Sequence, residues 1–393
     1  MAFRPSLFVF FALAVSTSVH ATEYHVATTG TDTNPGTSAL PCGGLGTSEG
    51  SEDITRVGHH LIRNNVIRRC GEAGVAGSHG MVASVIDGNL VEDINPARLF
   101  GGYETAGIKI HSAVDVVISN NVIRNVFNGG NGLHQGIWLD WQSQGSRITG
   151  NLIYGVSQSV LDLEMGHGPT LVDDNIFVGG SILDVSENTI FAHDLFVDTD
   201  FSFQAKDDRV ATYFAPHTTE AAGKAAHASA ENRYYDNVFV HKGTNGITQA
   251  PGYSSDYNVF YGGAEKSSWG DAHSAVVKGF DAAFGIVDHE RGAVVSWRTN
   301  GAVKTVAGPL VTRDFIGVNP VTKQGIEQHD GTPITLSKDI TGASRNPTHP
   351  SAGPLEVGAA ANKVTFAVGP YRSSATRSTT ERAAHAAHGA AKH

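Results

Sequence analysis

The sequence has little cysteine, little charge and no long hydrophobic run within its body. Two cysteines, Cys42 and Cys70, occur among 393 residues, which excludes a disulfide framework and leaves their pairing open. Charged residues make up only 17% of the chain and glycine contributes 46 residues, a composition typical of many short strands and turns. The formal net charge of −10 argues against a nucleic-acid partner.

The first 21 residues have the pattern of a secretory signal peptide. Arg4 supplies the positive start, residues 7–15 are apolar, and Ala21 closes a plausible cleavage site. No later segment approaches the ~20 consecutive apolar residues that a membrane-spanning helix needs. We therefore expect a secreted or periplasmic protein without a membrane span.

An Asn followed by alternating apolar residues recurs along the chain. Successive gaps from Asn65 to Asn175 are 24, 32, 30 and 24 residues, lengths that suit one turn of a coil. An Asn at a fixed corner stacks on its equivalents above and below. The pattern predicts an all-β, right-handed parallel β-helix with its corners at Asn65, Asn89, Asn121, Asn151, Asn175, Asn237 and Asn258.

The same pattern sets the predicted domain organisation. The signal peptide (1–21) precedes an N-terminal cap strand and a Gly/Ser-rich link (22–52). The β-helix domain covers residues 53–274, because the Asn pattern stops near Asp271. Residues 275–368 indicate a small β-rich C-terminal unit, and the low-complexity residues 369–393 are expected to be disordered.

Asp140 and Glu164 are 24 residues apart, as are Asn151 and Asn175. Each carboxylate ends a short strand, so the shared spacing predicts equivalent positions on successive turns. Adjacent strands lie about 4.8 Å apart, close to the roughly 5–5.5 Å between the two carboxyl groups of a retaining glycosidase. The spacing therefore predicts two carboxylates stacked at catalytic separation.

Strand parity predicts which side chains surround this pair. Apolar Ile137 and Leu139 should point inward, which leaves the residues between and after them on the outside. Applied to three turns, the register predicts one exposed strip, formed by Lys109, His111, Trp138, Asp140, Asp162 and Glu164.

Hydrolysis of a glycosidic bond needs one carboxylate at the anomeric carbon and one carboxylic acid that protonates the leaving oxygen. Trp138 and Trp141 flank Asp140, and indole faces commonly line sugar rings. Asp162 lies beside Glu164, and its negative charge would favour the protonated form that a general acid needs. These residue types indicate glycoside hydrolysis.

Two other β-helix chemistries fit less well. Gly166-His167-Gly168 and the acidic pair at 173–174 resemble polygalacturonase motifs, but their order is reversed and other elements are missing. A calcium-dependent lyase would use a base such as Lys109, whereas flanking tryptophans suit a neutral sugar. No Cys/His cluster has zinc spacing, so we expect no metal and no other cofactor.

The segments 102–111, 136–141, 162–169, 171–175, 216–220 and 232–237 resemble glycoside hydrolase family 120, and the likeness spans roughly residues 56–261. Members of that family are β-helical retaining β-xylosidases. The resemblance implies Asp140 as nucleophile, Glu164 as acid/base and a xylo-oligosaccharide as substrate. The substrate-binding residues expected around them are His111, Trp138, Glu104, His167, Trp141, Asp162, His217 and Glu220.

The chain departs from that family near its N-terminus. Residues 24–37 look like a β-helix cap, yet the chain passes through 42–51 directly to late turns near Arg56. The expected early turns and inserted β-sandwich are missing, so the completeness of the pocket stays open. Three further questions stay open: the sugar and linkage, the oligomeric state, and whether the protein is instead an α-L-fucosidase like glycoside hydrolase family 141 or an inactive glycan-binding protein.

Overall fold

The computed structural model describes residues 57–130, 132–202, 209–306, 308–356 and 360–368. The expected signal peptide, cap, link and C-terminal tail lie outside these residues, as does Cys42. Cys70 is half-buried and packs against the main core. Among the described residues, no helix has the length and apolar character needed to cross a bilayer.

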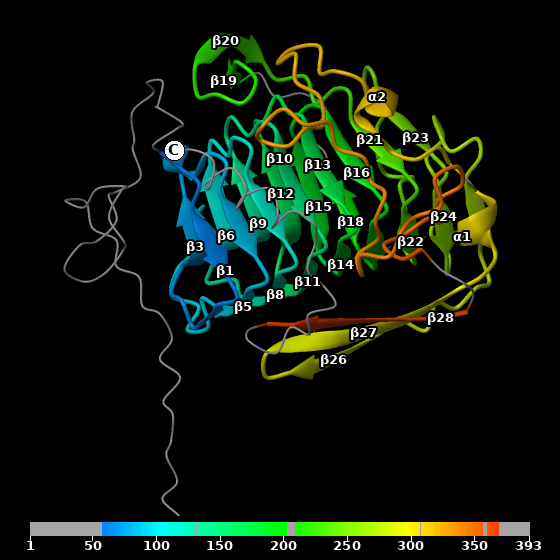
Figure 1. Cartoon of the computed structure of the whole chain (residues 1–393). Helices are drawn as coiled ribbons and strands as arrows, with labels where there is room; N and C mark the ends of the chain where they lie inside the picture. The colour runs from blue at the N-terminus through cyan, green and yellow to red at the C-terminus, as the bar shows by residue number, and fades with distance from the viewer. Residues whose placement is uncertain (1–56, 131, 203–208, 307, 357–359, 369–393) are drawn as a thin grey trace, which may run out of the picture. The chain divides into compact units, whose positions relative to one another are not determined.

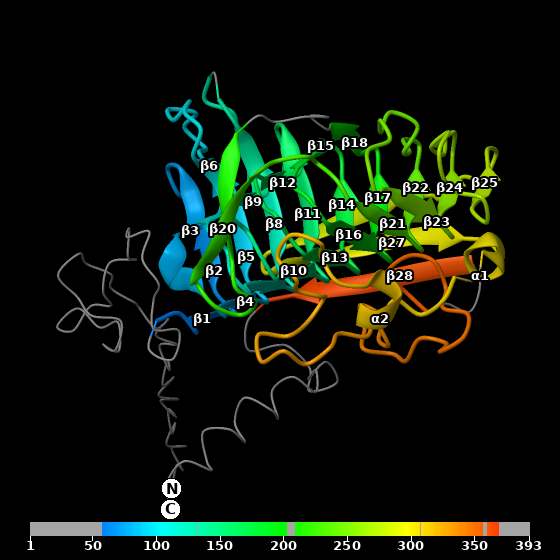
Figure 2. The same cartoon turned by 90° about the horizontal axis from the view of Figure 1, so that it is seen from above.

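The described residues coil through three parallel sheets, and successive turns place equivalent strands side by side (Figures 1 and 2). The first sheet contains β1 (Leu61–Arg63), β4 (Val85–Asp87), β7 (Val117–Ser119), β10 (Ser146–Thr149), β13 (Thr170–Asp173), β16 (Thr189–Ala192), β21 (Arg233–Tyr235) and β23 (Ser254–Asp256). The second contains β2 (Val66–Arg68), β5 (Leu90–Ile94), β8 (Val122–Val126), β11 (Leu152–Val156), β14 (Ile176–Val178), β17 (Leu195–Val197), β22 (Val238–Val240), β24 (Val259–Tyr261) and β25 (Ala275–Val277). The third contains β3 (Ala73–Gly77), β6 (Thr105–His111), β9 (His134–Asp140), β12 (Ser159–Glu164), β15 (Ser181–Val185) and β18 (Asp200–Ser202). This arrangement confirms the predicted parallel β-helix.

The predicted Asn ladder forms the corner between the first and second sheets. Each ladder residue after Asn65 accepts a hydrogen bond from the backbone N–H of its equivalent one turn earlier, at 2.7–2.9 Å. The residue before each ladder position has a positive φ, as Asn64 (59°) and Gly150 (65°) illustrate, which turns the chain sharply there. Asp194 takes the ladder position between Asn175 and Asn237, a turn that the sequence pattern missed.

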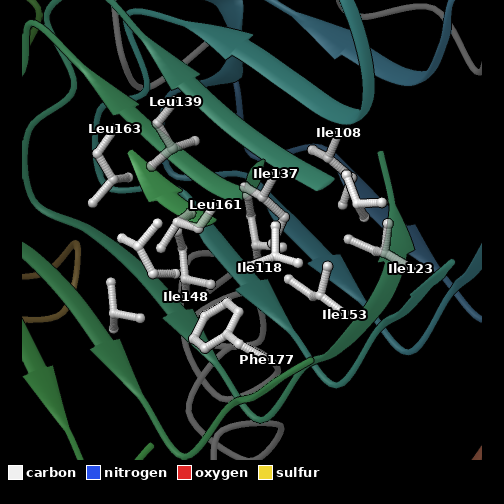
Figure 3. Packing of buried hydrophobic residues seen from close by; sticks show 14 of the residues in the cluster. Ile108, Ile118, Ile123, Ile137, Leu139, Ile148, Ile153, Leu161, Leu163 and Phe177 are labelled. Carbon is white, nitrogen blue, oxygen red and sulfur yellow. The ribbon is translucent and has the colours of Figure 1, made fainter. Parts of the chain in front are cut away.

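The inside of the coil is filled by the inward residues of the three sheets. Ile108, Ile137 and Leu161 stack on successive turns and are fully buried (Figure 3). Farther along, the side chains of Phe177, Phe196, Phe239 and Phe260 form a stacked row with centroids 4.9–5.2 Å apart. Each such side chain contributes about 1.5–3 kcal/mol by burial, so the row fixes the register of neighbouring turns.

Residues C-terminal to the coil cover the outer faces of two sheets. An antiparallel sheet of β26 (Gly285–His289), β27 (Gly292–Thr299) and β28 (Ala360–Ala367) packs on the second sheet, where Arg124 donates to the carbonyls of His289 and Gly292. Val311, Ile326 and Leu336 pack on the first sheet. Short helices interrupt the chain at η1 (His79–Met81), α1 (Ala302–Thr305) and α2 (Arg313–Ile316). The candidate site lies on the outer face of the third sheet.

Candidate active site

Asp140 and Glu164 lie at the ends of neighbouring strands of the third sheet. β9 and β12 run parallel, and their register pairs Asp140 with Glu164 and Trp138 with Asp162. On the other side of β9, His111 pairs with Asp140 and Lys109 with Trp138. The structure thus confirms the register predicted from the 24-residue spacing. Since paired strands lie about 4.8 Å apart, the two carboxylates are neighbours on one face.

A buried lysine holds Asp140. The Nζ atom of Lys109 lies 2.9 Å from Oδ2 of Asp140 and 2.9 Å from Oε2 of Glu104. It also lies 3.1 Å from the centroid of the Trp138 ring, a cation–π contact. The Nε2 atom of His111 lies 3.4 Å from the same Asp140 oxygen. Three predicted site residues, Asp140, Glu104 and Trp138, therefore contact one ammonium group, and His111 lies beside the same carboxylate.

Several polar atoms on this face have no hydrogen-bond partner among the described residues. They are Oδ1 of Asp140, Nε1 of Trp138 and Oδ1 of Asp162, and all three are buried. Buried polar atoms are bonded in the great majority of cases, so each unpaired one needs a reason. A polar ligand would supply partners for these atoms, so this face is a candidate binding site.

Glu164 is held from the other side, by Arg209. Nη1 of Arg209 donates to Oε1 of Glu164 at 2.6 Å, and its guanidinium lies 5.2 Å from the centroid of the Trp141 ring. Arg209 immediately precedes a hairpin of β19 (Val210–Phe214) and β20 (Ala221–Ala226), which leaves the coil and is labelled in Figure 1. Sequence reasoning missed Arg209, because nothing in its local pattern marks it as a neighbour of a residue 45 positions away.

The predicted strip lies on the outer side of the sheet, but the prediction that its side chains are exposed was wrong. Lys109, Trp138, Asp140 and Asp162 are each at most 3% exposed, although they lie on the outer side of the sheet. One reason is that they cover each other, and the Lys109 ammonium donates to the carbonyl of Tyr103 in the preceding loop. Strand parity gives the side of the sheet and does not report what packs over it.

The role predicted for Asp162 also needs correction. Burial, followed by the charges of Glu164 and Asp140, raises the pKa of Asp162 well above its usual value. The side chain accepts a hydrogen bond from Nε2 of Gln135 at 2.7 Å. Because burial favours the neutral acid, Asp162 supplies less of the negative charge that was expected to keep Glu164 protonated.

The remaining predicted residues lie in other clusters. His217 bonds to Asp115 at 3.0 Å and to Glu327 at 3.2 Å, and Glu220 is exposed where the hairpin returns. His167 is buried and bonds to Glu187 at 2.8 Å. No hydrogen bond or ion pair among the described residues joins any of these three to Asp140 or Glu164.

Sequence reasoning also missed a cluster that could hold a metal ion. His167, Glu187 and His227 are all buried, and their potential ligand atoms lie within 4.8 Å of one another. His167 and Glu187 follow equivalent strands of successive turns, and His227 follows β20. A search for closely spaced ligands could not find residues that only the coil and hairpin bring together.

Fold and site together define a β-helix protein with a covered pair of carboxylates on its third sheet. A family model described as the right handed beta helix region matches residues 48–196. The solved structure of XylC in complex with xylose is similar, with a TM-score of 0.71 and 27% identity over 79% of this chain. The match spans about half (52%) of the length of XylC.

Other comparisons add little. The Dettilon tailspike protein (gp208) also matches, at 9% identity and a TM-score of 0.26 over 60% of this chain and 68% of that one. No curated protein sequence matches the chain.

Proposed function

We propose that this protein is a retaining glycoside hydrolase that releases xylose from β-linked xylo-oligosaccharides. One observation carries the proposal: Asp140, ion-paired with Lys109 and with its other oxygen unbonded, lies one strand away from Glu164. The similarity to the structure of XylC, which was solved in complex with xylose, supports the choice of sugar. Trp138 and Trp141, which flank Asp140, suit a neutral sugar, and this supports hydrolysis rather than elimination.

Asp140 is the proposed nucleophile. Its Oδ1 atom attacks the anomeric carbon while Oδ2 stays paired with Lys109, so the contact with Lys109 orients the carboxylate for the attack. The bond to the leaving oxygen breaks as Glu164 transfers its proton to that oxygen. The products of this step are a glycosyl ester on Asp140 and the shortened oligosaccharide.

Glu164 then acts as the base. It removes a proton from water, and the water oxygen attacks the anomeric carbon and releases Asp140 as a carboxylate. In the structure, Arg209 donates a hydrogen bond to Oε1 of Glu164. The first step needs protonated Glu164, so we expect the Arg209 guanidinium to move away from Oε1 when the substrate binds.

Aromatic and polar groups around the pair would bind the sugar. Nε1 of Trp138 can donate to a sugar hydroxyl, and His111, 38% exposed, lies beside Asp140 at the solvent side. Trp141 contacts Arg209, the residue that bonds to Glu164. We expect Trp138 and His111 to contact the xylose that is released and Trp141 to contact the rest of the oligosaccharide.

Kinetic rescue tests the two roles. Asp140→Gly should abolish turnover of every nitrophenyl glycoside, and azide should restore some turnover as a glycosyl azide of inverted configuration. Glu164→Ala should spare nitrophenyl xylosides far more than natural xylo-oligosaccharides, because an acidic leaving group needs little proton donation. Asp314→Gly is the control, since that carboxylate is 93% exposed.

The outcomes separate the alternatives. If the wild-type protein prefers an α-L-fucoside, it is an α-L-fucosidase and not a xylosidase. Binding of xylo-oligosaccharides without turnover would assign a glycan-binding protein. Equal activity in the wild type and in both site variants would place the active site elsewhere.

A further inference from the structure

The cluster of His167, Glu187 and His227 lies under the start and end of the β19–β20 hairpin. His167 follows β12, Glu187 follows β15, and His227 directly follows β20. The three side chains are buried, and their potential ligand atoms lie within 4.8 Å of one another. The two histidine rings are neighbours, with centroids 5.0 Å apart. Three segments distant in sequence thus meet through groups that bind metals.

In each residue of the cluster, one potential ligand atom, here called the outer atom, is bonded to a backbone group. Nε2 of His167 bonds to the carbonyl of Ala211 at 3.2 Å, and Nε2 of His227 bonds to the carbonyl of Gly166 at 2.9 Å. The Oε1 atom of Glu187 accepts from the N–H of Ala228 at 2.8 Å. Metal-binding histidines almost always donate their second ring N–H to such a carbonyl or carboxylate, which sets the tautomer and the ring orientation.

With those outer atoms fixed, a metal would be bound by the inner ones. These are Nδ1 of His167, Nδ1 of His227 and Oε2 of Glu187, and the first and last lie 2.8 Å apart. Two imidazoles and one carboxylate are a ligand set of Zn²⁺, with bonds of about 2.0–2.2 Å in a tetrahedron. A small separation of His167 and Glu187 admits the ion, which would replace their direct hydrogen bond.

We propose that His167, Glu187 and His227 form a structural Zn²⁺ site. The site is buried and joins two coil residues, His167 and Glu187, to His227 at the end of the hairpin, so the ion would hold the hairpin on the coil. The hairpin segment begins beside Arg209, which bonds to Glu164, so the metal would also set the position of that arginine. A backbone carbonyl or a water molecule would complete the fourth position.

Metal content tests the site directly. Protein produced without an affinity tag and dialysed against zinc should retain one equivalent of Zn²⁺ by mass spectrometry. Glu187→Gln and His227→Gln should lose it, while His273→Gln should not. His273 is the matched control, because its side chain is 65% exposed and pairs with a carboxylate, Asp256, outside the cluster. Cobalt bound to the wild-type protein should give the visible absorption bands of a four-coordinate site, a readout that needs no variant to fold.

Removal of the metal tests its role. A chelator should lower the melting temperature of the wild-type protein by about 5 °C or more, and should speed proteolysis between Arg209 and His227. Absence of bound zinc and cobalt, or retention of one equivalent by Glu187→Gln, would overturn the proposal. None of these readouts depends on turnover, so they test the metal site independently of the proposed glycosidase activity.

Discussion

Replacing Lys109 by methionine should lower both the stability and the activity of the protein. The substitution keeps an unbranched apolar stem of similar length and removes the ammonium group, with its charge and its hydrogen-bond donors. Lys109 is 3% exposed and lies 2.9 Å from oxygens of both Asp140 and Glu104. Without it, Asp140, whose side chain is 5% exposed, becomes a buried carboxylate without a cation.

The distances set the expected size of the effect. Two unit charges 2.9 Å apart attract by about 6 kcal/mol at an effective dielectric constant of about 20. Desolvation of the lysine offsets part of this, and removing one partner of a buried pair costs about 3–5 kcal/mol. Glu104 is 56% exposed, so its pairing adds at most about 1 kcal/mol. We expect the free energy of unfolding at pH 7 to fall by about 3–5 kcal/mol.

The same substitution should impair catalysis. Lys109 holds Oδ2 of Asp140, the proposed nucleophile, so kcat/KM should fall when that contact is lost. Urea unfolding and kcat/KM on a nitrophenyl xyloside measure the two effects. Lys242→Met is the control, because Lys242 pairs with Asp200 on the surface, with both side chains exposed. Unchanged stability and unchanged kcat/KM in Lys109→Met would refute the role given to this ion pair.

Three further substitutions test the fold. Asn121→Ala leaves buried backbone and amide groups of the ladder unbonded and should cost at least about 3 kcal/mol in urea unfolding, whereas the exposed Asn245→Ala should stay within about 0.5 kcal/mol. Burial raises the pKa of Asp184 to about 7, above its unfolded value, so wild-type stability should fall by up to about 4 kcal/mol from pH 4 to 7. Asp184→Asn should flatten that slope, and an unchanged slope would contradict the assignment. The hydrogen bond to Asp115 raises the pKa of His217, so its stabilisation should be present below about pH 6.5 and decline above it. His217→Asn should remove the decline.

Regular features of the coil could be predicted from the sequence because each turn repeats the same local physics. The Asn ladder satisfies backbone groups at one corner, and apolar residues with a period of two define the inside of each strand. Those two constraints were enough to place Asp140 opposite Glu164 on neighbouring strands. Asp194 escaped the prediction because an aspartate oxygen accepts the same hydrogen bond as the asparagine oxygen it replaces.

Contacts made by residues outside the repeat could not be predicted. Arg209 reaches Glu164 from a hairpin, and His227 reaches His167 from the end of the same hairpin. The burial of Lys109 depends on a loop carbonyl at Tyr103 that no periodicity marks. His217, which was predicted to bind substrate, bonds to Asp115 from the loop between β19 and β20, a contact that no periodicity marks.

Covalent trapping tests the central claim most directly. An activated 2-deoxy-2-fluoro-xyloside slows both steps of a retaining mechanism and lets the glycosyl-enzyme accumulate. The account predicts that one xylosyl group binds per chain and that peptide mapping finds it on Asp140. Labelling of Glu164 or of any other residue, or steady turnover without a labelled intermediate, would contradict it.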